Sequence, residues 1–276
     1  IAGSLGRQLE FWQIKSNILE VRSTANLSKK NLEARALLET GLWKGPFENM
    51  IKNLPKRVKS KVEALAESYP GVRLPIVPFD FALILIPVAL SKRTNYDIFV
   101  LNWCRKIWKK FCGDIDSIVK SNSNELKKIG TSYQIFQLKK TLKSFKKWLN
   151  KLPKSLIKFR LASIPIERYI LSPTPEVARL ALIRCWGLGP KTVDSIILST
   201  FKATHFIPCD IHLRLVASRL DLCDKNAKMP NKYFCSNYFC GKVSSSYEIP
   251  LCPLAKNKTC LKSQLAYLRE MGGWFQ

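Results

Sequence analysis

Apolar residues recur at the spacing of an α-helix along most of this chain. In one stretch they return every three or four residues while lysines occupy another side, and the apolar set is Ile135, Leu138, Leu142, Phe145, Leu149 and Leu152. A second stripe within residues 97–111 consists of Leu101, Cys104, Trp108 and Phe111. Apolar positions with this period predict helices that bury one face in a core. We therefore expect a mostly α fold.

Two segments differ from this amphipathic pattern. Residues 81–90 are apolar on all sides, but the run is too short to cross a bilayer and contains Pro87, so it predicts a buried core helix. Residues 9–14 and 18–22 flank Lys15-Ser16-Asn17 and predict a short β-hairpin. Ser28 suits the N-cap of a helix that runs to Leu38.

Prolines and glycines break the helical pattern and divide the chain into four segments. Residues 1–75 form an N-terminal segment, with the β-hairpin followed by helices. Residues 76–174 form a helical core lobe, and residues 175–223 contain two helices joined by a glycine-rich turn. Residues 224–276 form a cysteine-rich loop and a C-terminal helix.

The charge of the chain predicts that this helical protein binds a polyanion. The sequence has 46 basic and 20 acidic residues, a formal net charge of +26. Residues 105–160 carry sixteen basic residues against Asp114, Asp116 and Glu125, and Lys139, Lys143, Lys147, Lys151, Lys154 and Lys158 share one side of the predicted helix. Nucleic acid is the expected partner. A generally basic proteome and a merely solvated lysine face are the alternatives.

The glycine-rich turn has the pattern of a helix-hairpin-helix. Cys185-Trp186-Gly187-Leu188-Gly189-Pro190-Lys191-Thr192 is followed, one helix length later, by Pro208-Cys209-Asp210-Ile211-His212. Glycine tolerates the positive φ of a tight turn, and proline suits a first helical turn. Such a turn points backbone N–H groups outward and can hold a phosphate.

These motifs resemble those of the helix-hairpin-helix (HhH-GPD) DNA glycosylase superfamily, which includes endonuclease III and the 8-oxoguanine glycosylases. Gly187, Gly189 and Asp210 match its signature, and His212 and Arg214 match the usual continuation. The resemblance covers about residues 69–223. It implies a two-lobed, mostly helical glycosylase fold and a monomer that acts in base excision repair.

The resemblance also implies roles for individual residues. Lys191 would be the nucleophile that attacks C1′ and forms a Schiff base, and Asp210 would stay ionised and stabilise the sugar cation. Gly187, Gly189, Lys92, Arg93, His212 and Arg214 would contact DNA, with Lys92 replacing the family's glutamine. Alone, such an aspartate is usually an N-cap and such a lysine is usually solvated. Their combination after a Gly-x-Gly turn favours a DNA glycosylase and AP lyase.

Two other functions are compatible with the same residues. In a monofunctional glycosylase, Lys191 would bind phosphate and Asp210 would activate water. In a noncatalytic DNA-binding protein, the hairpin would serve only as a clamp. The partner in each case is double-stranded DNA, with a damaged base or an abasic site for the enzymes. Oxidised guanine, oxidised pyrimidine, uracil and alkylated purine all remain candidate lesions.

Nine cysteines are many for a chain that shows no secretion signal, and we expect a reducing intracellular location. Cys104, Cys112 and Cys185 are predicted to be small core residues. Cys235, Cys240, Cys252 and Cys260 cluster after the catalytic segment and suggest a metal site. Cys252-Pro253-Leu254 resembles part of the superfamily's iron–sulfur loop, which implies a [4Fe–4S] cluster. Zinc and unliganded cysteines are the alternatives.

Overall fold

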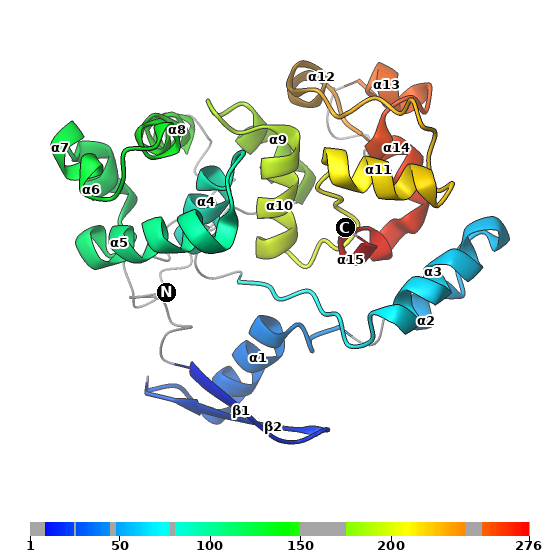
Figure 1. The fold of residues 1–276 in the computed structure, drawn as a ribbon, viewed down its shortest axis with the longest axis horizontal. Helices are drawn as coiled ribbons and strands as arrows, with labels where there is room; N and C mark the ends of the chain where they lie inside the picture. The colour runs from blue at the N-terminus through cyan, green and yellow to red at the C-terminus, as the bar shows by residue number, and fades with distance from the viewer. Residues whose placement is uncertain are drawn as a thin grey trace. The chain divides into compact units, whose positions relative to one another are not determined.

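The structure is a computed structural model that describes residues 9–24, 26–44, 48–77, 81–149, 175–240 and 250–275. The chain forms two compact units, and both are discontinuous in sequence. Unit 1 contains Ile1–Lys44 and Pro75–Leu171, and unit 2 contains Gly45–Leu74 and Ser172–Gln276. Helices dominate both units (Figure 1), which confirms the predicted fold class.

Unit 1 begins with the predicted β-hairpin and continues as helices. Strand β1 (Leu9–Lys15) pairs antiparallel with β2 (Ile18–Ser23). Helix α1 (Lys29–Thr40) begins after Ser28, whose side chain accepts a hydrogen bond from the Asn31 N–H, as expected of an N-cap. The remaining elements are α4 (Phe81–Leu90), the π-helix η2 (Tyr96–Val100), α5 (Leu101–Phe111), α6 (Ile115–Lys120), α7 (Ser123–Lys127) and α8 (Tyr133–Leu149).

The core of unit 1 lies between α4 and α8, where the rings of Phe81 and Phe145 stack with centroids 5.3 Å apart. The predicted apolar stripes are buried at Ile135, Leu138, Leu142, Phe145, Cys104, Trp108 and Phe111. Leu101 is half-buried, and the side chains of Leu149 and Leu152 lie outside the described residues. Within the described ranges, no helix has the length and apolar character needed to cross a membrane.

Two expectations about single residues of unit 1 need correction. Cys112 is exposed and not a core residue, because it caps the C-terminal end of α5 with a φ of 50°. Lys139 does not belong to a free lysine face, because its ammonium group donates a hydrogen bond to the carbonyl of Ser121 at the end of α6. Lys143 and Lys147 are exposed on α8, while Lys151, Lys154 and Lys158 lie outside the described residues.

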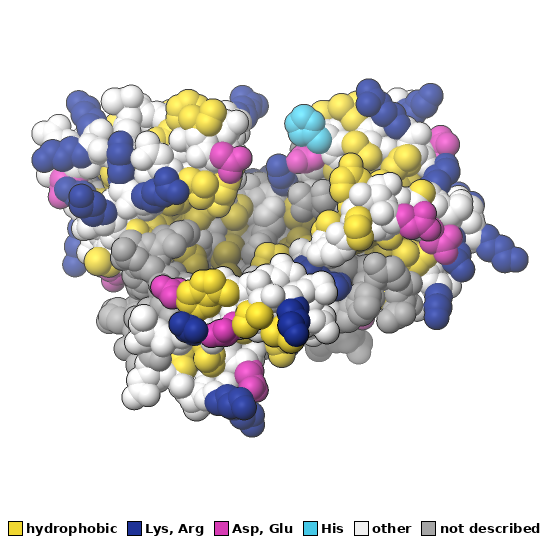
Figure 2. Space-filling model, turned by 60° about the horizontal axis from the view of Figure 1, so that its bottom comes forward, with side chains coloured by type: hydrophobic (Ala, Val, Ile, Leu, Met, Phe, Trp, Pro, Cys, Tyr) yellow, Lys and Arg dark blue, Asp and Glu magenta, His cyan; other side chains and the backbone are white. Residues whose placement is uncertain are grey.

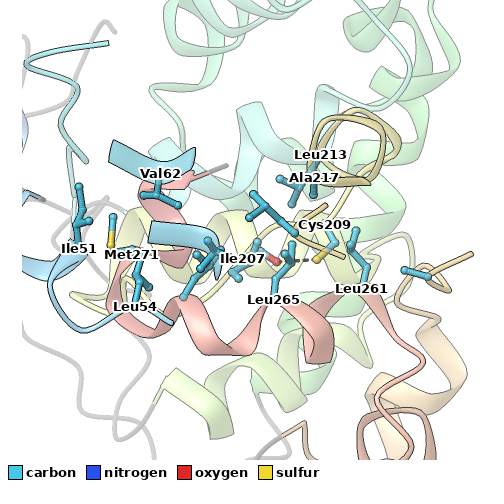
Figure 3. Close-up of a cluster of buried hydrophobic side chains, with 14 of the residues drawn as sticks. Ile51, Leu54, Val62, Ile207, Cys209, Leu213, Ala217, Leu261, Leu265 and Met271 are labelled. Carbon is cyan, nitrogen blue, oxygen red and sulfur yellow. Dashed lines mark hydrogen bonds between the residues drawn. The ribbon is translucent and has the colours of Figure 1, made fainter. Parts of the chain in front are cut away.

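Unit 2 combines an early helical segment with the C-terminal part of the chain. Its elements are α2 (Glu48–Ile51), α3 (Lys56–Ser68), α9 (Pro175–Ile183), α10 (Pro190–Thr200), α11 (Ile211–Arg219), α12 (Lys232–Asn237), α13 (Pro253–Lys256), α14 (Leu261–Gln264), the 3₁₀-helix η5 (Leu265–Met271) and α15 (Gly272–Phe275). Val62 of α3 is buried in the same cluster as Ile207, Leu213 and Leu265 (Figure 3). This cluster supports the end of α11 at which Asp210 lies.

Candidate active site

Helices α9 and α10 are joined by the predicted hairpin. Gly187 has a φ of 78°, the left-handed conformation that the tight turn needs and that glycine adopts without a steric cost. Pro190 is the first residue of α10, where its missing N–H is not required. Lys191 is therefore held in the first turn of a helix.

The outer side of the hairpin is open. A Cβ atom added to Gly189 would meet no atom within 4 Å. Among the described residues, the N–H groups of Gly187 and Gly189 donate to no protein acceptor. Lys232 of α12 supports the turn from the other side, because its ammonium group donates to the Cys185 carbonyl at 2.7 Å. The hairpin thus presents free N–H donors on a supported backbone.

Lys191 and Asp210 form an ion pair. Asp210 is the N-cap of α11, and its Oδ1 accepts a hydrogen bond from the Leu213 N–H at 2.8 Å. Its Oδ2 lies 2.8 Å from the Nζ of Lys191, whose side chain is 52% exposed. The structure therefore brings together the two residues predicted to be catalytic, with the amine accessible to a ligand.

The Asp210 carboxyl group is held in its charged form. Partial burial by itself raises its pKa, but the Leu213 N–H, the Lys191 ammonium group and His212 outweigh that effect, so the pKa lies below its usual value. Asp210 is consequently ionised at neutral pH. Its capping role and its charge do not conflict, since one oxygen accepts the Leu213 N–H and the other lies beside Lys191.

The loop that ends in Asp210 is anchored by buried side chains. Ile207 and Cys209 lie in the core of unit 2, and the Cys209 thiol donates to the Ile207 carbonyl at 3.4 Å (Figure 3). Helix α15 packs against the same loop, and the Gly273 N–H donates to the Thr204 carbonyl at 2.7 Å. A side chain at Gly272 would collide with Ile207. This close approach requires glycine and fixes the loop.

A buried ion network lies beneath the hairpin and was not predicted. Asp194, on the inner face of α10, is fully buried. The Nε of Arg179 (α9) lies 2.5 Å from its Oδ1, and the Nζ of Lys262 (α14) lies 2.8 Å from its Oδ2. Lys262 also lies 4.6 Å above the ring centre of Phe206. The network joins both hairpin helices to α14 and to the loop that ends in Asp210.

Two cations determine the charge state of Asp194. Burial raises its pKa, but Arg179 and Lys262 lower it further than burial raises it, so the pKa lies below its usual value. A buried carboxylate without these partners would be strongly unfavourable. The signal in the sequence is an aspartate among the apolar residues Val193, Ile196 and Ile197, all of which are buried. Its partners lie too far along the chain to be recognised.

The other predicted DNA-binding residues are distributed over both units. His212 is exposed and Arg214 is half-buried in the first turns of α11 in unit 2. Lys92 and Arg93 follow α4 in unit 1. The Lys92 carbonyl accepts a hydrogen bond from the Gln134 side chain at 3.0 Å. Arg93 is exposed and has a φ of 50°, so this turn holds a non-glycine residue in the left-handed region.

The four clustered cysteines all lie in unit 2, and Cys235, Cys252 and Cys260 are buried. A hydrogen bond between the Cys235 and Cys240 sulfurs lowers the pKa of the Cys240 thiol and raises that of the Cys235 thiol. Of the side chains that the structure describes, no three His, Cys, Asp or Glu groups are arranged to hold a metal ion. The [4Fe–4S] cluster and its zinc alternative remain predictions.

Metal analysis of purified protein tests this prediction. A [4Fe–4S] cluster held by cysteine thiolates would give four iron atoms per chain and visible absorption that bleaches on reduction. Replacing Cys252 by Ser should remove both signals, whereas Cys112→Ser, which changes an exposed cysteine outside the cluster, should leave them intact. Protein free of iron and zinc after anaerobic purification would show that the cysteines bind neither.

Basic side chains extend well beyond the hairpin. Figure 2 shows Lys and Arg side chains spread over the face that it draws. The chain as a whole has a formal net charge of +26, which favours association with polyanions.

Comparison with solved structures identifies the fold. The apo form of Clostridium acetobutylicum 8-oxoguanine glycosylase/lyase superposes with a TM-score of 0.59 at 14% identity, covering 97% of this chain and 81% of that one. Its complex with double-stranded DNA containing cytosine opposite 8-oxoG gives a TM-score of 0.58 at 13% identity, covering 94% and 80%. MBOgg1 in complex with a low-affinity DNA ligand gives a TM-score of 0.59 at 13% identity, covering 96% of this chain and 81% of that one. No family model and no curated protein matches the sequence. The chain therefore shares the fold of these proteins.

Proposed function

We propose that this chain, with the fold of the 8-oxoguanine glycosylase/lyases, is a DNA glycosylase with AP-lyase activity in base excision repair. The observation that carries the proposal is the 2.8 Å contact between Lys191 and Asp210 beside an open helix-hairpin. An accessible amine and an ionised carboxylate are the two groups that this chemistry requires. The Clostridium acetobutylicum protein of this fold is described as a glycosylase/lyase, which supports the same reaction.

Each group has a defined task in the proposed reaction. The Lys191 amine, once it has lost a proton, attacks C1′ of the damaged nucleotide, and the bond to the base breaks with the electron pair leaving on the base. Ring opening of the sugar then gives a Schiff base with Lys191. Loss of a proton from C2′ expels the 3′ phosphate by β-elimination and nicks the strand. Asp210 stabilises the positive charge that develops on the sugar.

The hairpin is proposed to bind the DNA backbone next to this site. The N–H groups of Gly187 and Gly189 lie at the positive end of α10, and such groups bind phosphate oxygens without a side chain. The open space beside Gly189 leaves room for the phosphate. Exposed His212 in the first turn of α11 is a further proposed contact.

An oxidised purine is the proposed lesion. The support comes from the Clostridium acetobutylicum protein of the same fold, which is described as an 8-oxoguanine glycosylase/lyase. Excision assays on duplexes that each contain one lesion test this choice. We expect release of 8-oxoguanine to exceed release of uracil or alkylated purines, and a preference for uracil would contradict it.

Strand cleavage tests the proposed function itself. We expect the protein to nick a duplex that carries one abasic site, leaving an unsaturated aldehyde at one new end and a phosphate at the other, because β-elimination produces these ends. Base release without nicking would instead support a monofunctional glycosylase. Tight binding with neither reaction would indicate a noncatalytic DNA-binding protein.

Replacing Asp210 by Asn should slow base excision by about 10²–10⁴-fold, because the neutral amide no longer stabilises the sugar cation. The amide oxygen can still accept the Leu213 N–H, so the protein should remain folded. Single-turnover excision at saturating DNA measures the effect. Asp116→Asn, which removes a carboxylate from the Asp116–Lys146 ion pair of unit 1, is the matched control. A rate within threefold of wild type in Asp210→Asn would contradict the role.

A further inference from the structure

A cavity lies in unit 2, at the C-terminal end of α11. Its volume is about 780 Å³, within the range of small-molecule sites. Asp210 lies at the other end of the same helix, about 12 Å away along the helix axis at 1.5 Å per residue. Residues of α3, of the chain after α11 and of the segment around α14 line the cavity, so it is separate from the Lys191–Asp210 pair.

The lining of this cavity carries more positive than negative charge. Arg57, Lys225 and Lys258 line it, and none of them forms an ion pair with any described residue. The two acidic residues of the lining already have partners. Asp221 lies 3.1 Å from the Lys61 ammonium group, and Asp224 accepts a hydrogen bond from Gln264 Nε2 at 2.6 Å. The three cations outnumber the two carboxylates, and Asp224 has only a neutral amide as its partner, so the lining keeps an excess positive charge that an anion would neutralise.

Hydrogen bonds of the Gln264 side chain hold the backbone beside two of these cations. Gln264 accepts from the Asp224 N–H at 2.8 Å and donates to the Lys258 carbonyl at 2.9 Å, so one side chain links the chain beside Lys225 to Lys258. Asp221 and Lys258 both have a φ of 51°, a conformation that non-glycine residues seldom adopt. Such conformations occur at ligand-binding loops.

The cavity also has an aromatic wall. The Tyr267 hydroxyl donates to the Leu222 carbonyl at 3.0 Å, which fixes the ring, and burial raises the pKa of Tyr267 to about 12, so the ring stays neutral. Cations next to a fixed aromatic ring are the combination that binds a phosphate together with a base. A bare phosphate would fill only a small part of this volume.

We propose that this cavity binds a nucleotide unit, with its phosphate on Arg57, Lys225 and Lys258 and its base against Tyr267. The bound nucleotide has two possible sources, a free nucleotide or an unpaired nucleotide of a DNA strand. The site is independent of the proposed catalysis, since neither Lys191 nor Asp210 lines it.

Calorimetric titration with adenosine 5′-monophosphate tests the free-nucleotide source. We expect wild type to bind it and the triple variant Arg57→Gln, Lys225→Gln, Lys258→Gln to bind at least tenfold more weakly. The matched control replaces Lys52, Lys228 and Lys256, which are exposed and do not line the cavity. Lys191→Ala should bind the nucleotide as wild type does, so loss of lyase activity leaves this result unaffected. Inorganic phosphate, as a second probe, should bind more weakly than the nucleotide.

The salt dependence of DNA binding tests the strand source. If the cavity holds a nucleotide of the strand, the slope of log Kd against log salt should fall by about 2–3 in the triple variant, roughly one for each lost phosphate contact. The control triple should change this slope less than the cavity triple. The proposal is overturned if wild type binds no nucleotide and the two triple variants show the same salt slope.

Discussion

Replacing Lys191 by Ala should abolish both the borohydride-trapped DNA adduct and strand nicking at an abasic site. The nucleophilic amine is lost, so no Schiff base forms, and we expect the single-turnover rate to fall by at least ~10³-fold. Asp210 remains in place as the N-cap of α11, because its bond from the Leu213 N–H does not involve Lys191. DNA affinity should change little in comparison, since Lys191 contributes one charge to a net charge of +26.

Lys191→Arg separates charge from nucleophilicity. Arginine keeps the positive charge beside Asp210, but its guanidinium stays protonated and forms no Schiff base under these conditions. We therefore expect Lys191→Arg to be as inactive as Lys191→Ala. Lys59→Ala, which removes another partly exposed lysine from an ion pair, should retain activity. Nicking by Lys191→Arg at a rate close to wild type would show that the lysine acts only as a cation.

Replacing Asp194 by Ala should lower the free energy of unfolding by about 3–5 kcal/mol, because it leaves Arg179 and Lys262 buried without a counter-charge. In a chain of this size that loss should lower the melting temperature by about 10 °C or more. Differential scanning calorimetry measures it. Asp221→Ala removes an exposed partner of Lys61 and should cost no more than about 1 kcal/mol.

Two further variants separate charge burial from lost packing. Replacing all three network residues by apolar ones (Arg179→Met, Asp194→Leu, Lys262→Met) should recover much of the stability, because no buried charge then remains unpaired. Asp194→Asn should be less sensitive to acid than wild type. The folded pKa of Asp194 lies below its unfolded value of about 3.9, so its stabilisation is present at neutral pH and lost as the pH falls through the folded pKa. A loss under 1 kcal/mol in Asp194→Ala would contradict this account.

The sequence was sufficient to predict a structural feature wherever the residues that determine it are neighbours in the chain. Gly187 and Pro190 shape the hairpin locally, and Asp210 caps α11 through a bond to a residue three positions away. The close approach of Lys191 to Asp210 is not local in this sense, and only the resemblance to the glycosylases placed the two residues in one site. The β-hairpin and the core helix at residues 81–90 are also local features, and the structure confirms both.

Features that depend on distant residues could not be predicted. Lys262 contacts Asp194 although the two residues are far apart in the sequence, and the periodicity of neither segment predicts the pair. The sequence predicted Lys139 to belong to the lysine face of its helix, but it donates a hydrogen bond to a carbonyl at the end of a different helix. Helix α3 joins the C-terminal part of the chain in unit 2 because Val58 and Val62 pack into the same core. Such contacts appear only once the helices are packed.

Borohydride trapping followed by peptide mapping tests the central claim most directly. Wild-type protein is incubated with a duplex that carries one abasic site, reduced, digested with protease and analysed by mass spectrometry. The account predicts one covalent adduct, on the peptide that contains Lys191, with the modification on its side chain. An adduct on another lysine, or no adduct under conditions in which the strand is nicked, would contradict it.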